Sequence, residues 1–270
     1  MIVVIATTED ELAGVRARVS EHGVGAVEVV APGAARRLVL APVDDESHAH
    51  ALASALRAEG KAAVARPEAG VRLEAWMCDT SPLTFGDRLR VCLAWSEHDR
   101  GDGSRLVELG AGGFGSGKHP STRLVLEQLL ARIRGGERVL DVGCGSGVLG
   151  LCAVRLGASA VVAVDVKPDA VEATRRNAVL NGMQPQVAAT CAPMAEIDGV
   201  FDVVVANVGR AAVVELAPEL VRRVSPVGWL AVSGISPPQC SLVVGFLRPL
   251  VELERTTSGE WSAVVLAHRP

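Results

Sequence analysis

The first 66 residues alternate between short apolar runs and longer amphipathic segments. The apolar runs, which are typical of strands, cover residues 2–6, 24–30, 38–43 and 62–65. Two amphipathic segments between them, one beginning near Thr8 and one covering residues 44–59, have the spacing of helices. The resulting order, strand, helix, strand, strand, helix, strand, predicts a small ferredoxin-like α+β domain over residues 1–67.

The pattern changes at residue 138, where apolar strands begin to alternate with helical segments. Predicted strands cover residues 139–142, 160–164, 187–190, 203–206 and 230–233, and predicted helices cover residues 148–156, 168–181, 211–224 and 237–247. Such alternation implies parallel pairing and a doubly wound α/β sheet. Two further apolar runs, residues 251–255 and 261–267, predict a closing antiparallel hairpin.

A less regular stretch separates these two patterns. The sequence Arg66-Pro67-Glu68-Ala69-Gly70 has the composition of a boundary. We expect a connector over residues 68–105, with one strand at residues 88–94, and a main domain over residues 106–270.

Composition narrows the classes of function. The chain is 49% hydrophobic and 21% charged over 270 residues, which excludes a largely disordered protein. It has 3% aromatic residues, no Tyr and a net charge of −4, so neither a base-stacking platform nor a basic nucleic-acid surface is expected. The six cysteines form no CxxC pair, which favours free thiols over zinc ligands or disulfides.

An uncharged stretch at residues 224–247 is long enough to raise the question of a membrane span. Pro237, Pro238 and several glycines divide it, and this composition predicts a strand, a loop and a helix instead. The N-terminal apolar run is followed by acidic residues and has no basic flank, so no signal peptide is expected. We therefore expect a cytoplasmic protein with no membrane contact.

The first predicted strand of the main domain leads into a glycine-rich turn. Glycines stand at positions 143, 145 and 147 of the sequence VLDVGCGSG, and a helix is predicted from Val148. Glycines allow a sharp turn and close contact with a ligand, at which the helix amides also point. A dinucleotide fold needs its third glycine one place later, where Val148 stands, so this spacing argues against NAD.

Asp165 ends the next predicted strand, twenty residues after Gly145. A carboxylate at this position can accept hydrogen bonds from both hydroxyls of a ribose. The glycine turn alone could simply close a tight strand-helix connection. Together with Asp165, it predicts a site for an adenosine that carries a small uncharged or cationic group.

Three further segments carry a family resemblance. They are GFGSGKHPST at residues 113–122, DVVVAN at residues 202–207 and GEWS at residues 259–262. With the glycine turn and Asp165, they resemble the PrmA family of class I S-adenosylmethionine-dependent methyltransferases. The resemblance runs from about Trp76 to the C-terminal end of the chain. It implies a Rossmann-like fold, S-adenosyl-L-methionine as cofactor and N-methylation of lysine or N-terminal amines of a ribosomal protein.

The resemblance also implies roles for individual residues. Cofactor contacts are implied for Thr122, Gly143, Asp165 and Asn207, and the wider candidate cofactor set adds Phe114, Gly115, Asp141, Gly145 and Gly147. Asn207 is the catalytic candidate, because an amide there can orient an amine nucleophile. We assign no acid or base, since an in-line transfer depends chiefly on alignment, and we expect no metal. The structural alternatives are a helix cap for Thr122 and a turn residue for Asn207.

Two cations depart from the family pattern near the acceptor side. Lys118 and Arg210 stand where the family generally has uncharged residues, and with His119 they form the candidate substrate pocket. Such a pocket would repel an amine and hold a carboxylate or phosphate, which suggests a small-molecule N- or O-methyltransferase as an alternative. Both side chains could equally extend into solvent, and His119 could shape the loop before its helix. A non-catalytic adenosine-binding module, with the N-terminal domain in a recognition role, is a more remote alternative.

Overall fold

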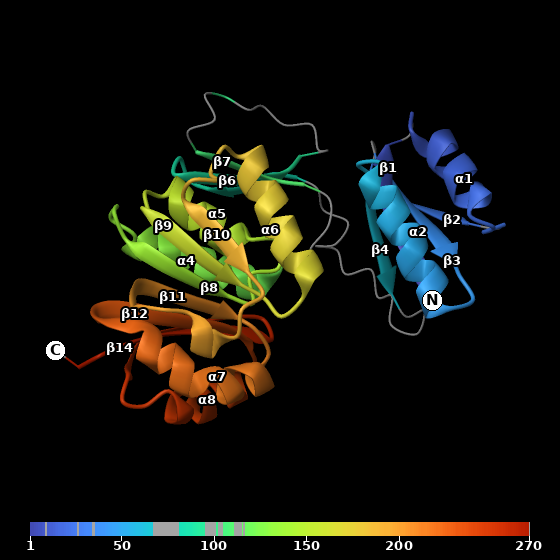
Figure 1. The fold of residues 1–270 in the computed structure, drawn as a ribbon. Coiled ribbons are helices and arrows are strands. Elements are labelled where there is room, and N and C mark those ends of the chain that lie inside the picture. Colours follow the sequence, from blue (N-terminus) through green and yellow to red (C-terminus); the bar gives the residue numbers. More distant parts are fainter. Residues whose placement is uncertain are drawn as a thin grey trace. The chain divides into compact units, whose positions relative to one another are not determined.

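The computed structural model describes residues 1–8, 10–25, 27–33, 36–66, 81–94, 101, 105–110, 115 and 117–269. The chain forms two compact units, Met1–Thr80 and Ser81–Pro270, each of which is described by itself (Figure 1). The boundary lies at residue 80, within the connector predicted for residues 68–105. Residues 81–94 contribute two strands to the second unit, so this part of the predicted connector belongs to a folded sheet.

Over its described residues, the first unit has one sheet and two helices. Its elements are β1 (Ile2–Thr8), α1 (Leu12–Glu21), β2 (Glu28–Gly33), β3 (Arg36–Pro42), α2 (Glu46–Ala58) and β4 (Ala62–Arg66). The strands lie in the order β2-β3-β1-β4, and every neighbouring pair is antiparallel. The element order is the one that the apolar pattern predicts, and a role in substrate recognition stays a prediction.

The core of the first unit lies between one face of this sheet and the two helices. Val3 and Ile5, two residues apart on β1, are fully buried against Leu52 and Leu56 of α2 and their neighbours. The helix begins after Asp45, whose carboxylate accepts a hydrogen bond from the main-chain N–H of His48 at 2.7 Å. The cap and the apolar face together explain why this segment is helical.

The second unit begins with a small three-stranded sheet. It consists of β5 (Leu83–Phe85), β6 (Leu89–Leu93) and β7 (Leu106–Leu109); β6 pairs antiparallel with β5 and parallel with β7. Leu89, Val91 and Leu109 of this sheet are buried in the same core as the helices of the main domain. The sequence predicts β6 but neither β5 nor β7, because runs of three and four residues carry too little periodicity.

The main domain is a doubly wound α/β sheet, as the sequence predicts. Its elements are α4 (Pro120–Arg132), β8 (Arg138–Val142), α5 (Val148–Arg155), β9 (Ala160–Val164), α6 (Pro168–Leu180), β10 (Val187–Thr190), β11 (Phe201–Asn207), α7 (Arg210–Arg223), β12 (Val224–Ile235), α8 (Cys240–Phe246), β13 (Val251–Ser258) and β14 (Trp261–Ala267). The strand order is β10-β9-β8-β11-β12-β14-β13. All neighbouring pairs are parallel except those of β14, which confirms the closing hairpin.

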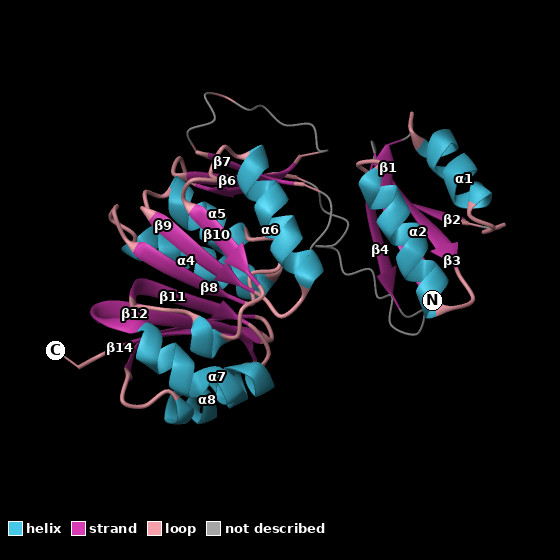
Figure 2. Ribbon diagram, viewed as in Figure 1, coloured by secondary structure: helices cyan, strands magenta, loops and turns pink. Residues whose placement is uncertain are grey.

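Helices cover both faces of this sheet (Figure 2). Val203 and Val205 of β11 belong to a core shared with α4, α5 and α6, whereas Val204 and Ala206 belong to a core shared with α7 and α8. Because successive side chains of a strand point to opposite faces, a strand buried on both sides must be apolar throughout. The uncharged stretch at residues 224–247 forms β12, a short 3₁₀ turn and α8. Over the described residues, no helix has the length and apolar character needed to cross a membrane.

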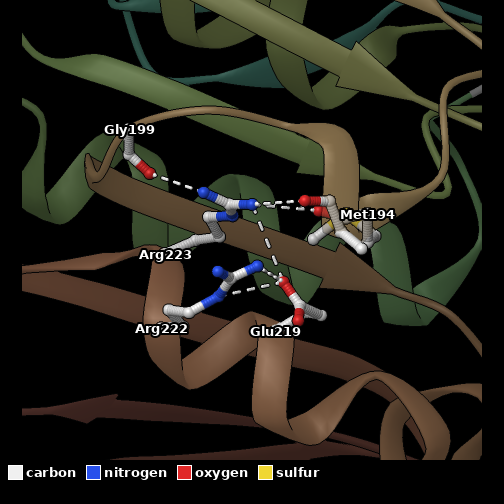
Figure 3. A network of polar contacts seen from close by, with 6 residues as sticks. Met194, Gly199, Glu219, Arg222 and Arg223 are labelled. Atoms are coloured by element: carbon white, nitrogen blue, oxygen red, sulfur yellow. Dashed lines mark hydrogen bonds and ion pairs between the residues drawn. The ribbon is translucent and has the colours of Figure 1, made fainter.

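A buried arginine at the end of α7 fixes the segment that follows β10. Arg223 donates hydrogen bonds to the carbonyls of Met194, Ala195 and Gly199 at 3.2, 3.3 and 3.2 Å and pairs with Glu219 at 3.7 Å (Figure 3). The side chain is 6% exposed. One guanidinium therefore satisfies three main-chain acceptors of a segment that has little other regular structure.

Arg223→Met should lower the free energy of unfolding by about 2–4 kcal/mol, because it keeps the aliphatic stem but leaves these carbonyls without their donor. Arg222→Met on the same helix is the matched control. Its side chain is 56% exposed and pairs only with Glu219 among the described residues, so the expected change is about 0.5 kcal/mol or less. Urea denaturation of both variants measures this difference, and equal effects would contradict it.

Candidate active site

The predicted site residues meet at the carboxyl edge of the parallel sheet. Gly143 directly follows β8, Asp165 directly follows β9, and Asn207 ends β11. These strands are parallel neighbours, so their carboxyl ends lie at the same edge. In open α/β sheets this edge is the side that binds ligands.

The turn after β8 is held in a conformation that needs glycine. Gly143, Gly145 and Gly147 have φ values of 73°, 56° and 79°, a region that residues with side chains rarely adopt. A Cβ on Gly143 would lie 2.3 Å from Cγ1 of Val208, and one on Gly147 would lie 2.8 Å from Cγ2 of Thr174. The turn therefore presents bare main chain at the sheet edge.

Asp165 is fixed by two main-chain donors. Its Oδ2 accepts a hydrogen bond from the N–H of Gly145 at 3.1 Å, and its Oδ1 accepts one from the N–H of Lys167 at 2.9 Å. Each carboxylate oxygen can accept a further bond, so both can still receive ligand hydroxyls. Val166 is 89% exposed beside it. Val166 is not identified from the sequence, because a valine near the end of an apolar strand gives no signal of its own.

Asp141 lies beneath the turn and is 1% exposed. Its Oδ2 accepts a hydrogen bond from the N–H of Gly150 at 3.0 Å, and no described group bonds its Oδ1. Burial and, to a lesser extent, the Asp165 carboxylate raise the pKa of this carboxyl to about 7, although the hydrogen bond from Gly150 opposes the rise. Asp141 therefore supports the turn from below rather than from the exposed side.

A direct hydrogen bond joins Thr122 and Asn207, which are 85 positions apart. Nδ2 of Asn207 donates to Oγ1 of Thr122 at 3.0 Å. The interpretation of Thr122 as a helix cap is wrong, because α4 begins at Pro120 and its cap is His119, whose Nδ1 accepts from the N–H of Ser121 at 3.3 Å. His119 thus shapes the loop before its helix, as one reading of the sequence expects.

The candidate substrate-pocket residues have different surroundings. The ring of His119 contacts Trp261 edge-on, with 4.7 Å between ring centroids. Lys118 is 8% exposed, and its Nζ lies 3.4 Å from Oγ of Ser81. Arg210 is exposed in the first turn of α7. A pocket shared by Lys118, His119 and Arg210 stays a prediction.

The loop before α4 also carries candidate cofactor residues. Phe114 lies outside the described residues. Gly115 is described, and its carbonyl accepts a hydrogen bond from the Ser146 hydroxyl at 2.5 Å. This bond ties the loop to the glycine turn.

The C-terminal hairpin anchors α4, the helix that carries Thr122. Arg132 pairs with Glu254 of β13 at 2.6 Å, and Gln128 donates to the same carboxylate at 3.1 Å. The Arg132 guanidinium also lies 5.9 Å from the ring centroid of Trp229 on β12. The position of Thr122 relative to Asn207 thus depends on contacts at the far end of its helix.

Cys144, which lies within the glycine turn, is not activated as a nucleophile. Burial raises the pKa of the Cys144 thiol to about 12, although the Thr174 hydroxyl, 3.3 Å from its Sγ, opposes this. A thiol that stays protonated at neutral pH packs like a small apolar side chain.

Together, the sheet order, the closing hairpin and the turn with Asp165 define the Rossmann-like fold of class I methyltransferases. The crystal structure of ribosomal protein L11 methylase from Lactobacillus delbrueckii subsp. bulgaricus is similar, with a TM-score of 0.64 and 25% identity over 70% of this chain and 99% of that one.

Sequence comparison narrows this class to one family. The family described as Ribosomal protein L11 methyltransferase (PrmA) matches residues 50–269. Proteins named ribosomal protein L11 methyltransferase from Geobacter sp. (strain M21) and Pelobacter propionicus are 40% and 41% identical over 197 and 199 residues, which is 70% of this chain. The match spans 64% of the length of these relatives. The chain belongs to this family.

Gly143→Ala should lower the free energy of unfolding by about 2–4 kcal/mol, because left-handed backbone strain and overlap with Val208 add together. Gly182→Ala is the matched control. It has φ of 66° but no atom within 4 Å of a Cβ, so it tests the backbone strain alone, about 1 kcal/mol. Adding Val208→Ala should partly restore the Gly143 variant. Thermal and urea unfolding measure all three effects, and a loss no larger at Gly143 than at Gly182 would contradict the overlap.

The buried Asp141 predicts a pH-dependent stability. Folding raises its pKa from 3.8 to about 7, so the folded protein binds more protons between these values. Its contribution to the free energy of unfolding therefore falls as the pH rises from about 4 to about 7. Asp141→Asn should remove this slope, whereas Asp198→Asn, an exposed control, should keep it. Urea denaturation between pH 5 and 8 tests this, and a wild-type-to-variant difference that is constant with pH would contradict it.

Proposed function

We propose that this chain is an S-adenosylmethionine-dependent methyltransferase that methylates amino groups of ribosomal protein L11. The observation that carries the proposal is the bonded pair Thr122–Asn207 at the same sheet edge as the glycine turn and Asp165. In addition, the family to which the chain belongs is described by this activity.

The residues at the edge fit S-adenosylmethionine. Val208 and Thr174 pack directly against Gly143 and Gly147, where a Cβ would overlap them, and the three glycines of the turn would let its main chain lie close to a ligand. Asp165 would accept the ribose hydroxyls, and the exposed Val166 would offer an apolar surface to the adenine. When bound, the cofactor supplies a methyl group on a sulfonium, whose leaving group is already good.

The chain's own residues then have an orienting task. The Asn207 amide donates through Nδ2 to Thr122, which directs its Oδ1 acceptor elsewhere. That oxygen can accept an N–H of the incoming amine and thereby aim the amine lone pair. The Thr122 hydroxyl accepts this bond and can still donate its own proton to the methionine part of the cofactor. Alignment and proximity provide the acceleration, and no side chain need act as a base.

The family description and the charge of the chain favour a protein acceptor over a small anionic molecule. The small-molecule alternative depends on Lys118 and Arg210 lining the acceptor pocket. Lys118 lies beside Ser81, and Arg210 is exposed. The net charge of −4 suits a basic ribosomal protein, and the unit Met1–Thr80 would provide its recognition surface.

The test is transfer of radiolabelled methyl groups from S-adenosylmethionine to purified ribosomal protein L11. Wild type should label it, and Asn207→Ala should lower kcat about 100-fold through lost alignment. Calorimetry should show cofactor binding to both. If the wild type binds cofactor but leaves L11 unlabelled, the substrate assignment is wrong.

The same calorimetry tests the cofactor site. Asp165→Asn should weaken cofactor binding at least 10-fold, because the ribose loses charged acceptors. Asp169→Asn, in the exposed first turn of α6, should bind like wild type. Titration with NAD should give no heat. Equal affinity of wild type and Asp165→Asn would contradict the placement of the ribose.

A further inference from the structure

Helix α6 has a polar stripe on its buried side. Thr174 and Asn177 of α6 and Asn181, which caps the C-terminal end of the helix, are three and four residues apart, a spacing that places them on the same side. Thr174 is 0% and Asn177 2% exposed. Buried polar side chains on a helix need hydrogen-bond partners. Here the partners are main-chain groups and the thiol of Cys144.

Asn177 uses both ends of its amide to join two separate segments. Its Oδ1 accepts a hydrogen bond from the N–H of Gly110, and its Nδ2 donates to the carbonyl of Ser146, both at 2.8 Å. Gly110 directly follows β7, and Ser146 lies in the glycine turn. Gly110 is thus joined to the glycine turn through the side chain of Asn177.

Ser146 makes a second attachment to the same segment. Its hydroxyl donates to the carbonyl of Gly115 at 2.5 Å, and it is 2% exposed. Gly110 and Gly115 are therefore both held against the glycine turn, one through Asn177 and one through Ser146. In the sequence, Gly115 stands four positions before His119 and seven before Thr122.

We propose that Asn177 is a positioning residue of the cofactor site, which sets the approach to Thr122 relative to the glycine turn. The inference rests on the proposed function, because it concerns binding of the same cofactor. Asn177 acts through Ser146 and Gly110 and is not itself a catalytic residue.

Asn181 provides a matched comparison. Its Oδ1 accepts from the N–H of Glu108 at 2.8 Å, and its Nδ2 donates to the carbonyls of Glu108 and Asn177 at 2.7 Å each. It fastens α6 to β7 (Figure 1) but bonds no residue of the turn among those described. A merely structural role for Asn177 would make the two residues equivalent.

The experiment compares Asn177→Asp with Asn181→Asp. Each change keeps the size and one acceptor oxygen but replaces the amide donor with a carboxylate oxygen, so the same negative charge is added at both positions. Asn177→Asp should raise the Kd for S-adenosylmethionine, measured by calorimetry, about five- to tenfold. Asn181→Asp should change it less than twofold, even where urea denaturation shows a similar loss of stability. A change in cofactor affinity at Asn177 alone, with a similar loss of stability in both variants, distinguishes a positioning role from a purely structural one.

Equal Kd values for Asn177→Asp and wild type would overturn the proposal, as would equal weakening by the two variants. If Asn177→Asp does not fold, Ser146→Ala decides, because it cuts the second attachment while keeping Asn177. It should also weaken binding, and unchanged affinity would overturn the proposal. If calorimetry shows no binding of S-adenosylmethionine to the wild-type protein, the proposed function itself is wrong, and so is the positioning role of Asn177.

Discussion

In the turn between β8 and α5, Gly143 and Gly147 have no room for a Cβ, and three neighbouring elements lie close against the turn. Val208, which follows β11, lies against Gly143, and Thr174 of α6 lies against Gly147. Asp165 at the end of β9 bonds the N–H of Gly145. A larger residue in the turn would displace a strand end, a helix or the carboxylate. The same closeness brings the candidate ligand groups within reach of one another.

The arrangement of the main sheet could be predicted because its inner strands are largely buried. Most of these strands contain an apolar run that ends at a polar residue or glycine, although β8 includes the buried Asp141. The observed elements agree with the predicted ones to within a few residues, except that β12 begins at Val224, six residues before its predicted start. β5 and β7 could not be predicted in this way. They pair with β6, but such short strands gain their stability from that pairing and from the helices beneath rather than from a local pattern.

Apart from what the family resemblance implies, the candidate site was predictable only where it depends on local backbone geometry. The glycine turn and Asp165 each belong to the end of a single strand, so both can be recognised in the local sequence. The bond between Asn207 and Thr122 is not, since it depends on how α4 packs on the sheet. The role of Asn177 likewise depends on partners elsewhere in the chain, whereas the loop-shaping role of His119 depends on Ser121, two residues away. The one signal in the sequence that could have identified Asn177 is a polar residue at a position where the helical pattern predicts a buried side chain.

The attachment of α4 to the C-terminal hairpin has a consequence for how the site forms during synthesis. Glu254 is 122 and 126 positions beyond its partners Arg132 and Gln128, so these contacts close some of the longest loops in the domain. Such contacts form late and slowly. A nascent chain can complete β8, the turn and β9 well before β13 has left the ribosome. The half of the site around the glycine turn can therefore assemble first, and the half around Thr122 gains its final support only with the hairpin.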